Sequence, residues 1–500
     1  MHRRESESKF LVPSAEVLCD VPEFLRSVAG LHVRPGRTIR VRDVYVDTDD
    51  RWLTRAGVGL RLRRRAESTH WTLKADACPR TPEGWERIEI EQPTRQAPRF
   101  PCRLPPGPIS TWLGPIARRW TLRPIGQLRI DRTEHEVSTT DGGCARVCCD
   151  SVGAQVAERS IDWAEVEWET VRDSKKLRRA MREFRRRTGW DPLTDSKIER
   201  AYRLAGISPI PAAPTKLNFC PTMQVADAIP ALLNHFWHRV QWLWPRAYVG
   251  VDPEALHDLR VAFRRLRAVL WMFRTSLPDT ARAFRNALRT IARAAGEVRD
   301  ADVAMDLVQR FVESSKLESN ESIALQEVIR PLRELRAERL RRFRAQWAGP
   351  IGHAVERTWA RLHNQFSRFE NPEPLKPFMR DVVRSVRRKA AKVIRKLVKT
   401  SPDADYHRAR LAAKRYRYAL ELWAELDGRK VQRRLKRLRE FQGLLGDLQD
   451  VVVLREWVRA RSDRLRVSAR RRVARRLLAW LEQRRRELRA RAWRAVRRWR

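Results

Sequence analysis

The strongest constraint on the fold is a change of pattern in the middle of the chain. Before about residue 170, polar and apolar residues alternate in short runs separated by proline, glycine and aspartate, which is typical of antiparallel strands. After residue 220 the apolar residues follow a long helical period, and glycine is scarce. Between the two lies the segment 206–215, GISPIPAAPT, whose prolines disfavour helix. We therefore predict an N-terminal domain at 1–206, a Pro-rich linker at 207–218 and a helical domain at 219–500.

The charge divides at the same place. The 500 residues carry a formal net charge of +44, and 42% of them are hydrophobic, so we expect globular domains rather than a disordered basic tail. Residues 1–206 hold 39 basic and 30 acidic side chains, whereas residues 207–500 hold 66 and 31. We therefore expect a polyanionic partner mainly at the C-terminal part.

Cysteine usage and hydropathy indicate a cytoplasmic protein without a zinc site. No two cysteines form a CxxC pair, and the seven stand at Cys19, Cys78, Cys102, Cys144, Cys148, Cys149 and Cys220. The N-terminus lacks the apolar core of a signal peptide, and apolar stretches such as 268–273 are too short to cross a membrane. We expect reduced thiols and no membrane insertion.

The helical part contains an internal repeat at an offset of 150 residues. HDLRVAFRRLR, starting at residue 257, aligns with HRARLAAKRYR, starting at residue 407, and GEVRD at 296–300 aligns with GDLQD at 446–450. A second Pro-rich break at 371–377 separates the copies. We predict a duplicated helical bundle with repeats at about 219–370 and 378–500.

Each copy of the repeat places basic residues on one helix face, within an arc of roughly 80°. These residues are His257, Arg260, Arg264 and Arg267 in the first copy and His407, Arg410, Lys414 and Arg417 in the second. The inward side is predicted to carry Leu259, Phe263, Leu266 and Leu270, and then Leu411, Ala412, Tyr418 and Leu422. A solvated basic face is the alternative, but a histidine at the same position in both copies favours a phosphate-binding surface.

Both repeats resemble the CHAD domain, through the HxxRxxx[RK]RxR helix and the later GxxxD segment. The resemblance implies an all-α module that binds inorganic polyphosphate on a basic central surface, and it assigns phosphate contacts to those eight basic residues. For Asp300 and Asp450 we expect pairing with a basic neighbour or helix capping rather than catalysis.

The N-terminal strands place charged residues on one face. Glu5, Glu7 and Lys9 alternate with small residues, and later strands repeat the pattern. Its later members are Arg61 and Arg63; Thr72 and Lys74; Arg87, Glu89 and Glu91; and Glu165, Glu167 and Glu169. This face is either the outside of an ordinary sheet or the interior of a closed barrel that holds a divalent cation and a chain of phosphates. Periodicity leaves both open.

Six motifs in order resemble the CYTH family of triphosphate tunnel metalloenzymes over about residues 3–205. They are ExExK at 5–9, YVDT at 45–48, LRLR at 60–63, WTLK at 71–74, EVEWE at 165–169 and SKIERAY at 196–202. The resemblance implies an antiparallel β tunnel barrel with flanking helices. The expected fold class is therefore α+β, with the barrel followed by the all-α duplicated bundle.

The same resemblance implies roles for the tunnel residues. Glu5, Glu7, Glu167 and Glu169 would hold Mg²⁺ or Mn²⁺, and the triphosphate would be bound by Lys9, Arg61, Arg63, Lys74, Arg87, Arg132 and Lys197, with Arg129 as the alternative to Arg132. Glu167 or Glu169 would orient or deprotonate the attacking water, and Lys9 would take part in catalysis. Glu89, Glu91, Glu165 and Asp150 are wall positions without an assigned role.

These expectations combine into an inorganic triphosphatase tethered to a polyphosphate-binding domain, cytoplasmic and associated with polyphosphate granules. One alternative is another CYTH reaction, adenylate cyclisation or thiamine triphosphate hydrolysis. The other is a non-catalytic protein that binds polyphosphate or nucleic acid. The Arg-rich segment 470–500, with Trp480, Trp493 and Trp499, could stack on bases, although we expect its tryptophans to pack inward.

Overall fold

A computed structural model describes residues 3–66, 68–76, 85–94, 97–214, 220, 222–427, 429–462 and 465–499. Cys78 and positions 215–218 of the predicted linker lie outside the described residues. The chain forms two compact units: Met1–Ala213 with Trp242–Ala255, and Pro214–Gln241 with Leu256–Arg500. Each unit is described by itself below.

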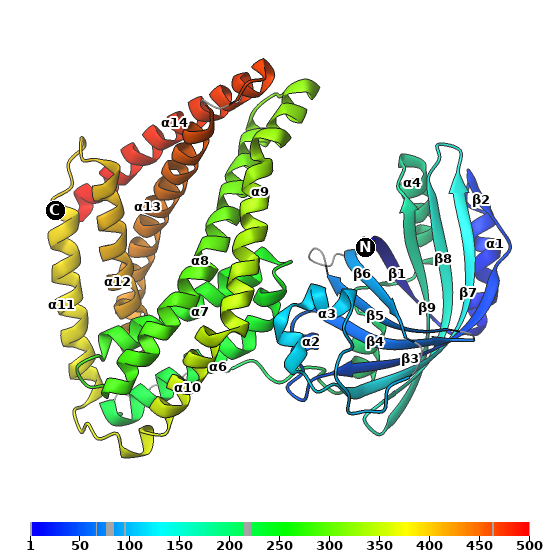
Figure 1. The fold of residues 1–500 in the computed structure, drawn as a ribbon. Helices are drawn as coiled ribbons and strands as arrows, with labels where there is room; N and C mark the ends of the chain where they lie inside the picture. Colours follow the sequence, from blue (N-terminus) through cyan, green and yellow to red (C-terminus); the bar gives the residue numbers. More distant parts are fainter. Residues whose placement is uncertain are drawn as a thin grey trace. The chain divides into compact units, whose positions relative to one another are not determined.

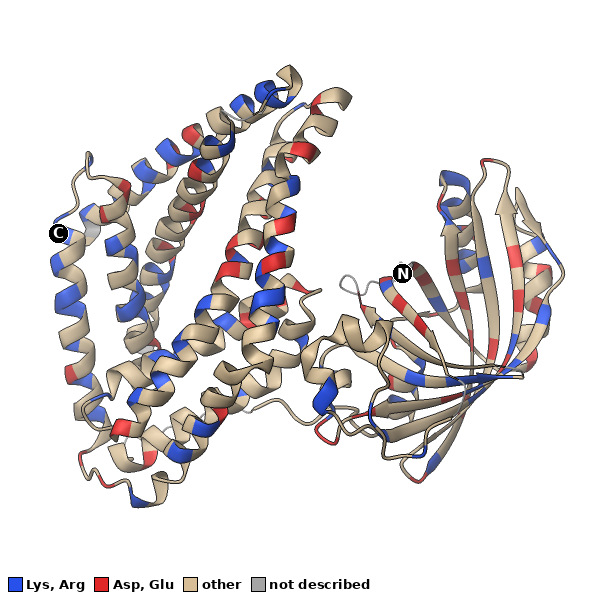
Figure 2. Cartoon of the chain, in the orientation of Figure 1, with Lys and Arg blue, Asp and Glu red and all other residues tan. Residues whose placement is uncertain are grey.

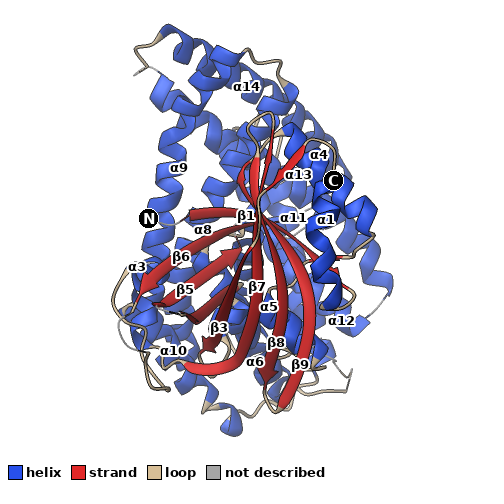
Figure 3. Cartoon of the chain, turned by 90° about the vertical axis from the view of Figure 1, so that its right-hand side faces the viewer, coloured by secondary structure: helices blue, strands red, loops and turns tan. Residues whose placement is uncertain are grey.

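The first unit is built on a closed antiparallel barrel. Eight strands follow one another around it in the order β1-β6-β5-β4-β3-β7-β8-β9, and β1 closes the ring because it pairs with both β6 and β9. Figure 3 shows β1 and β5 to β9 among the strands of the barrel. The short strands β2 and β10 pair with β7 and β1. The strands are β1 Arg3–Val12, β2 Leu31–Val33, β3 Arg37–Asp47, β4 Val58–Arg65, β5 Ser68–Asp76, β6 Trp85–Pro93, β7 Arg123–Thr139, β8 Cys144–Val156, β9 Arg159–Arg172 and β10 Pro192–Leu193. The predicted closed barrel is confirmed, and the open-sheet alternative is wrong.

Short helices flank the barrel. They are α1 Val21–Arg26, α2 Trp52–Arg55, α3 Pro108–Leu113, α4 Lys175–Thr188 and α5 Lys197–Leu204, with the 3-10 turns η1 Glu16–Asp20 and η2 Pro115–Arg119. On the outer face, Val166 and Trp168 of β9 pack in one core with Phe184 of α4 and Leu25 of α1. These helices therefore cover apolar residues that would otherwise face water.

Helix α5 covers an apolar region inside the barrel. Ile130 and Val152 are an even number of residues from Arg132 and Asp150, so all four side chains point to the same, inner side of the sheet. Ile130 and Val152 pack in one core with Ile198 of α5. The barrel interior is thus apolar near α5 and charged beyond it.

The second unit is all-helical. Its helices are α6 Val225–Val249, α7 Pro253–Met272, α8 Asp279–Ser314, α9 Ser319–Ala348, α10 Pro350–His363, α11 Leu375–Arg395, α12 Asp403–Asp427, α13 Arg429–Ser462 and α14 Ser468–Val496, with the turns η3 Phe366–Arg368 and η4 Arg497–Trp499. The end of α6, from Trp242, and the start of α7, to Ala255, belong to the first unit. Helices α7 and α12 carry the two copies of the repeated motif. The longer helices α8 and α13 follow them, so the two copies have the same order of elements (Figure 1). Among the described residues, no helix has the length and hydropathy needed to cross a membrane.

The predicted inward face is confirmed in the first copy of the repeat and wrong in the second. Leu259, Phe263, Leu266 and Leu270 are all buried. In the second copy Leu411 is 40% exposed, and only Tyr418 of the four predicted residues is buried. The buried positions there are instead Tyr406, Ala409, Ala413, Tyr416 and Leu420. Alanine and tyrosine occupy positions that leucine and phenylalanine occupy in the first copy, so large aliphatic residues alone did not mark this face.

The tryptophans of the C-terminal segment that have described ring contacts pack inward. Trp480 lies 5.9 Å from Phe311, and Trp499 lies 5.6 Å from Phe441, as distances between ring centroids. Both rings are partly buried and pack against buried phenylalanines. The structure therefore gives them a packing role.

Candidate functional site

The register of the barrel strands brings the predicted tunnel residues together. Glu7 lies opposite Glu169 and Lys9 lies opposite Glu167 across the β1–β9 pair. Glu5 lies opposite Arg87 across the β1–β6 pair. Because every second side chain faces the interior, these acidic and basic residues share the inner wall. Figure 2 shows acidic and basic positions interspersed along the strands.

A cavity of about 160 Å³ lies inside the barrel, and ionisable side chains line most of it. Nine basic residues line it: Lys9, Arg61, Arg63, Arg65, Lys74, Arg87, Arg132, Arg146 and Lys197. Six acidic residues do so as well: Glu5, Glu89, Glu91, Glu134, Glu167 and Glu169. One cavity thus presents donors for an anion and carboxylates for a cation.

Glu7 is fixed behind this lining by two cations. Arg87 Nη1 donates to Glu7 Oε1 at 3.0 Å, and Lys74 Nζ lies 3.5 Å from Glu7 Oε2. Lys74 also donates to Glu5 Oε2 at 2.6 Å. Burial raises the pKa of Glu7, but Lys9, Lys74 and Arg87 outweigh burial and hold this pKa well below its usual range. Glu7 is therefore ionised, and it holds Lys74 and Arg87 in place.

Asp43 holds the arginines of β4, and this role was not predicted from the sequence. Arg63 donates to both carboxylate oxygens of Asp43, at 2.8 and 2.7 Å, and Arg61 Nη1 lies 3.2 Å from Asp43. Arg61 also donates to the Tyr45 hydroxyl at 3.0 Å. Although burial opposes it, the two arginines lower the pKa of Asp43 to about 2. The available signal was that Asp43 is two residues from Tyr45, in the predicted YVDT motif, and so shares its face.

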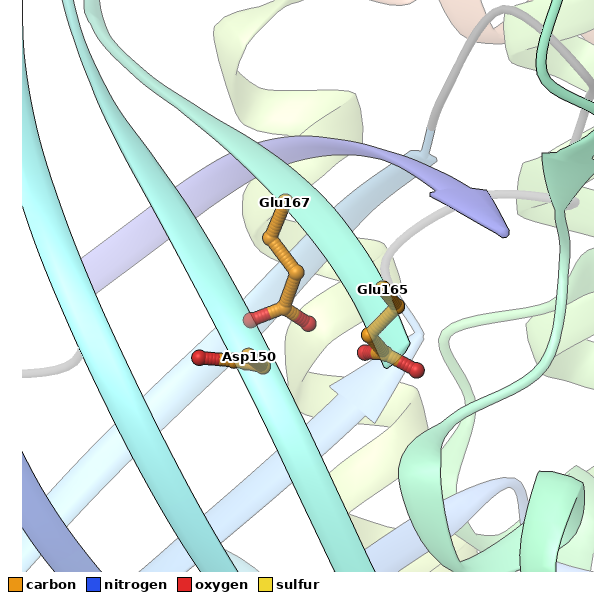
Figure 4. Close-up of side chains that lie close together, drawn as sticks. All are labelled: Asp150, Glu165 and Glu167. Atoms are coloured by element: carbon orange, nitrogen blue, oxygen red, sulfur yellow. The ribbon is translucent and has the colours of Figure 1, made fainter. Parts of the chain in front are cut away.

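Three carboxylates on β8 and β9 form a tight cluster. Oxygens of Asp150, Glu165 and Glu167 all lie within 4.8 Å of one another (Figure 4). Lys197 Nζ lies 2.6 Å from Glu165 and 2.8 Å from each of the other two. Arg132 makes two 2.7 Å hydrogen bonds to Asp150 and one of 2.6 Å to Glu167. Fixed protein cations thus already neutralise this cluster.

The start of helix α5 places Lys197 beside the three carboxylates. Ser196 caps the helix by accepting from the Glu199 amide, while the Glu199 carboxylate accepts from the Ser196 amide at 2.8 Å. Lys197 is the first residue of the helix and is 4% exposed. Asp150 and Glu165, which had no assigned role, are its partners.

Among the predicted metal ligands, Glu169 has loose ion pairs, and Glu5 pairs with Lys74. Burial raises the pKa of Glu169; Glu5 and Glu167 add to the rise, while Lys74 and Arg132 oppose it. The nearest cations to Glu169 are Arg146 at 3.3 Å and Arg132 at 3.6 Å. Crowded carboxylates with hard oxygen donors suit Mg²⁺ or Mn²⁺, so the residues present fit such an ion.

The structure also decides which arginine of β7 faces the tunnel. Arg132 lines the cavity and is 6% exposed. Arg129 is exposed on the outer side of the barrel. The alternative assignment of Arg129 to the tunnel is therefore wrong.

In the helical unit, the basic residues of α7 and α12 lie close enough for their charges to interact. Burial and the charges of Arg264, Arg410 and Arg260 together lower the pKa of Lys414 to about 7. Four guanidinium Nε atoms of the two faces are buried without a hydrogen-bond partner in the described part of the chain: those of Arg264, Arg267, Arg410 and Arg417. The two repeats thus form one joint surface with unused donors.

Polar partners lie at the margin of this joint surface. Arg260 Nη1 lies 3.4 Å from Asp300 Oδ1, and His407 Nδ1 lies 2.7 Å from Gln449 Oε1. Burial raises the pKa of Asp450 to about 6; Arg410 opposes this rise and Asp300 adds to it. The two aspartates of the GxxxD segments therefore lie close enough to interact.

Comparisons with known proteins agree with this division. The CYTH domain model matches residues 3–202, and the CHAD domain model matches residues 231–459. An uncharacterized protein of Mycobacterium tuberculosis strain CDC 1551 is 27% identical over 486 residues, which cover 90% of this chain and 87% of that protein.

Two solved structures are similar to one part of the chain each. The CHAD domain from the plant Ricinus communis is 22% identical with a TM-score of 0.48, covering 57% of this chain and 96% of that one. The putative adenylyl cyclase HpAC1 from Hippeastrum, described as having a dominant triphosphatase activity, is 15% identical with a TM-score of 0.27, covering 41% and 97%. By the two family models, the chain consists of a CYTH domain followed by a CHAD domain.

Proposed function

We propose that the barrel is a divalent-metal-dependent inorganic triphosphatase and that the helical unit binds inorganic polyphosphate. The observation that carries the first half is the shared lining of one cavity. Lys74, Arg87 and Arg132 reach it together with Glu5 and with Glu169, whose ion pairs are loose. A triphosphate bound with a divalent cation needs both kinds of group.

The cations of the tunnel are held in place before any substrate binds. Arg63 and Arg61 are fixed by Asp43, Arg87 by Glu7, and Arg132 by Asp150. Donors that need no rearrangement stabilise the charge that develops during phosphoryl transfer. A metal held by Glu5 and Glu169 would supply further neutralisation of phosphate charge.

Glu169 is the better placed of the two predicted bases. The Glu167 carboxylate contacts Lys9, lies 2.8 Å from Lys197 and lies 2.6 Å from Arg132. Burial raises its pKa, but these cations hold it far below the usual range, so Glu167 is a poor proton acceptor. Glu169 keeps looser contacts and faces the same cavity. We therefore assign to Glu169 the orientation or deprotonation of the attacking water.

The unused donors of the helical unit support the polyphosphate half of the proposal. Placing Arg264, Arg410 and Lys414 near one another costs electrostatic and desolvation free energy in the free protein. A linear anion with regularly spaced charges offsets that cost and forms charge-assisted hydrogen bonds with the guanidinium forks. Inorganic polyphosphate has this chemistry.

The test is phosphate release from tripolyphosphate by the full chain, with and without Mg²⁺ or Mn²⁺. We expect release that needs the metal and that is lost in the double variant Glu5→Gln, Glu7→Gln. Glu158→Gln is the matched control, because Glu158 is an exposed acid of the same unit. Formation of a cyclic nucleotide from ATP as the main reaction would favour a cyclase. No phosphate release from the unmodified chain, with polyphosphate binding unchanged in the double variant, would favour a binding protein without activity.

A further inference from the structure

Three arginines form a row on the outer face of the barrel. Arg42 of β3 lies directly opposite Arg64 of β4 on one side and opposite Arg129 of β7 on the other. All three side chains are exposed. Side chains at opposite positions of an antiparallel pair have Cβ atoms about 4.5–5.5 Å apart, and like charges there destabilise the sheet.

Two residues further along β3 and β7, the opposite positions on this face hold an arginine and an aspartate, whose charges compensate one another. Arg40 lies opposite Asp131, and its Nε atom is 3.4 Å from the carboxylate. Within the described part of the chain, no hydrogen bond or ion pair joins Arg42, Arg64 or Arg129 to an acidic side chain. The row therefore holds three unmatched positive charges where its neighbour holds a balanced pair.

A groove of about 530 Å³ lies along this row. Its volume is in the range of pockets that bind small molecules. Val44 and Leu62, which lie opposite one another on β3 and β4, give it an apolar floor, and Phe100 lines it from the segment before α3. Gln127 and Gln155, opposite one another on β7 and β8, add amide groups. Asp162 of β9, separated from Arg129 of β7 by strand β8, adds one carboxylate to the lining. The groove thus combines a cationic edge of three arginines with a single acid, an apolar floor with an aromatic ring, and neutral hydrogen-bonding groups.

We propose that this groove is a second anion site, separate from the tunnel, that binds a nucleoside phosphate. The phosphates lie on Arg42, Arg64 and Arg129, because guanidinium groups bind phosphate oxygens in pairs. The planar base lies between Phe100 and the floor of Val44 and Leu62, and the amides of Gln127 and Gln155 bind its polar edge. An inorganic phosphate chain would leave the apolar part of the groove unused.

The site shares strands with the tunnel but not its side chains. Asp43 and Arg63, the chain neighbours of Arg42 and Arg64, are buried and point into the barrel, because successive side chains of a strand alternate between its faces. The inference does not depend on the proposed triphosphatase activity, since it rests on residues outside the tunnel. Hydrolysis and binding at the groove can be measured separately.

The test is calorimetric titration of the full chain with ADP in the absence of divalent metal. We expect the double variant Arg42→Gln, Arg129→Gln to raise the Kd for ADP at least tenfold and to leave tripolyphosphate hydrolysis unchanged. Arg40→Gln is the matched control on the same face, and it should keep the Kd of the unmodified protein. The melting temperature of the double variant should not fall below that of the control, because the double variant removes opposed like charges.

A second variant tests the organic part of the ligand. Phe100→Ala should weaken ADP binding severalfold while leaving the weaker binding of pyrophosphate unchanged. The proposal is overturned if the chain does not bind ADP, or if ADP binding survives in the double variant and is lost in Arg87→Gln. Equal affinities for pyrophosphate and ADP would also overturn it, because the groove would then bind inorganic anions without using its apolar floor.

Discussion

The ammonium of Lys197, in the first turn of α5, lies 2.6 Å from the Glu165 carboxylate on β9. The Asp150 and Glu167 carboxylates each lie 2.8 Å from the same ammonium. This contact anchors the helix that covers the apolar part of the barrel interior. The Lys197 ammonium also occupies the centre of the acidic cluster.

Replacing Lys197 by methionine should destabilise the barrel. Removal of the ammonium leaves three buried carboxylates with too few cations, and breaking a buried ion cluster in this way costs about 3–5 kcal/mol. Chemical denaturation of the full chain, followed by a probe in the barrel, measures the loss. Lys175→Met is the control, since Lys175 is the exposed first residue of α4. Equal stability of the two variants would contradict the anchoring role.

Replacing Asp43 by asparagine should lower stability at neutral pH and loosen the arginines of β4. The pKa of Asp43 is about 2 in the folded chain against roughly 3.9 when unfolded, so its ionised form stabilises the fold by roughly 2 kcal/mol at pH 7. Because the folded-state pKa is the lower one, this contribution is present above about pH 4 and disappears as the pH falls to about 2.

The free energy of unfolding of wild type and Asp43→Asn, measured by denaturant from pH 7 to pH 2, checks both points. The difference between the two should shrink as the pH falls below about 4. The KM for tripolyphosphate should rise in the variant, because Arg61 and Arg63 lose the carboxylate that orients them. A difference in stability that stays constant down to pH 2 would contradict the ion-pair assignment.

Strand alternation, a local property, predicted which charged residues share a face, whereas the closed barrel was predicted from the resemblance to the CYTH family. Glu5, Glu7 and Lys9 share a face whatever the rest of the chain does. Strand β7 shows the limit of that reasoning. Its even positions Leu128 and Ile130 are apolar and point inward under α5, so apolar residues do not mark the outer side there. For this reason the pattern alone left Arg129 and Arg132 as alternatives.

Features that depend on contacts between distant segments could not be predicted from the sequence. The three carboxylates around Lys197 meet only because α5 returns to the barrel after β9 has closed it. In the helical unit, spacing predicted two separate basic faces. That Arg264 and Lys414 act on one another follows from the packing of the two repeats, which no local period encodes.

Replacing Arg264 and Arg410 together by glutamine should abolish tight polyphosphate binding and leave tripolyphosphate hydrolysis intact. Hydrogen bonds to charged groups contribute about 1.5–3 kcal/mol each, so the Kd should rise by at least 100-fold. The double variant Arg265→Gln, Arg415→Gln is the control, because it removes the same charge from the neighbouring positions of the same helices. If both double variants weaken binding equally, net charge rather than the joint surface accounts for affinity.

Substitutions of Glu167 and Glu169, both on β9, should separate effects on activity from effects on stability. Glu169→Gln should lower kcat by roughly 10²–10⁴-fold, the usual contribution of a general base, with little loss of stability. Glu167→Gln should lower the melting temperature as well, since Lys9, Lys197 and Arg132 lose a shared partner. Phosphate release and thermal unfolding of both variants provide the comparison, and a stable, inactive Glu167→Gln would reverse the assignment.

Polyphosphate binding should take up a proton at Lys414. In the free protein the pKa of Lys414 is about 7, because burial and the charges of Arg264, Arg410, Arg260 and Arg417 disfavour its ammonium form. A bound polyanion favours that form and returns the pKa toward its ordinary value of roughly 10.4. Below pH 7 Lys414 is already protonated, so its contribution to affinity is constant there. As the pH rises from 7 to 9, each binding event must recruit a proton, and the Kd should rise up to about tenfold per pH unit.

Asp450 also faces this surface, but its pKa of about 6 places its own titration below the window from pH 7 to 9. Titrations with polyphosphate at constant ionic strength across that window therefore isolate Lys414. Calorimetry in two buffers of different ionisation enthalpy counts the protons taken up. In Lys414→Met the slope of log Kd against pH should vanish although binding is weaker. A slope that persists in this variant would mean that another group takes up the proton, and that Lys414 is already charged in the free surface.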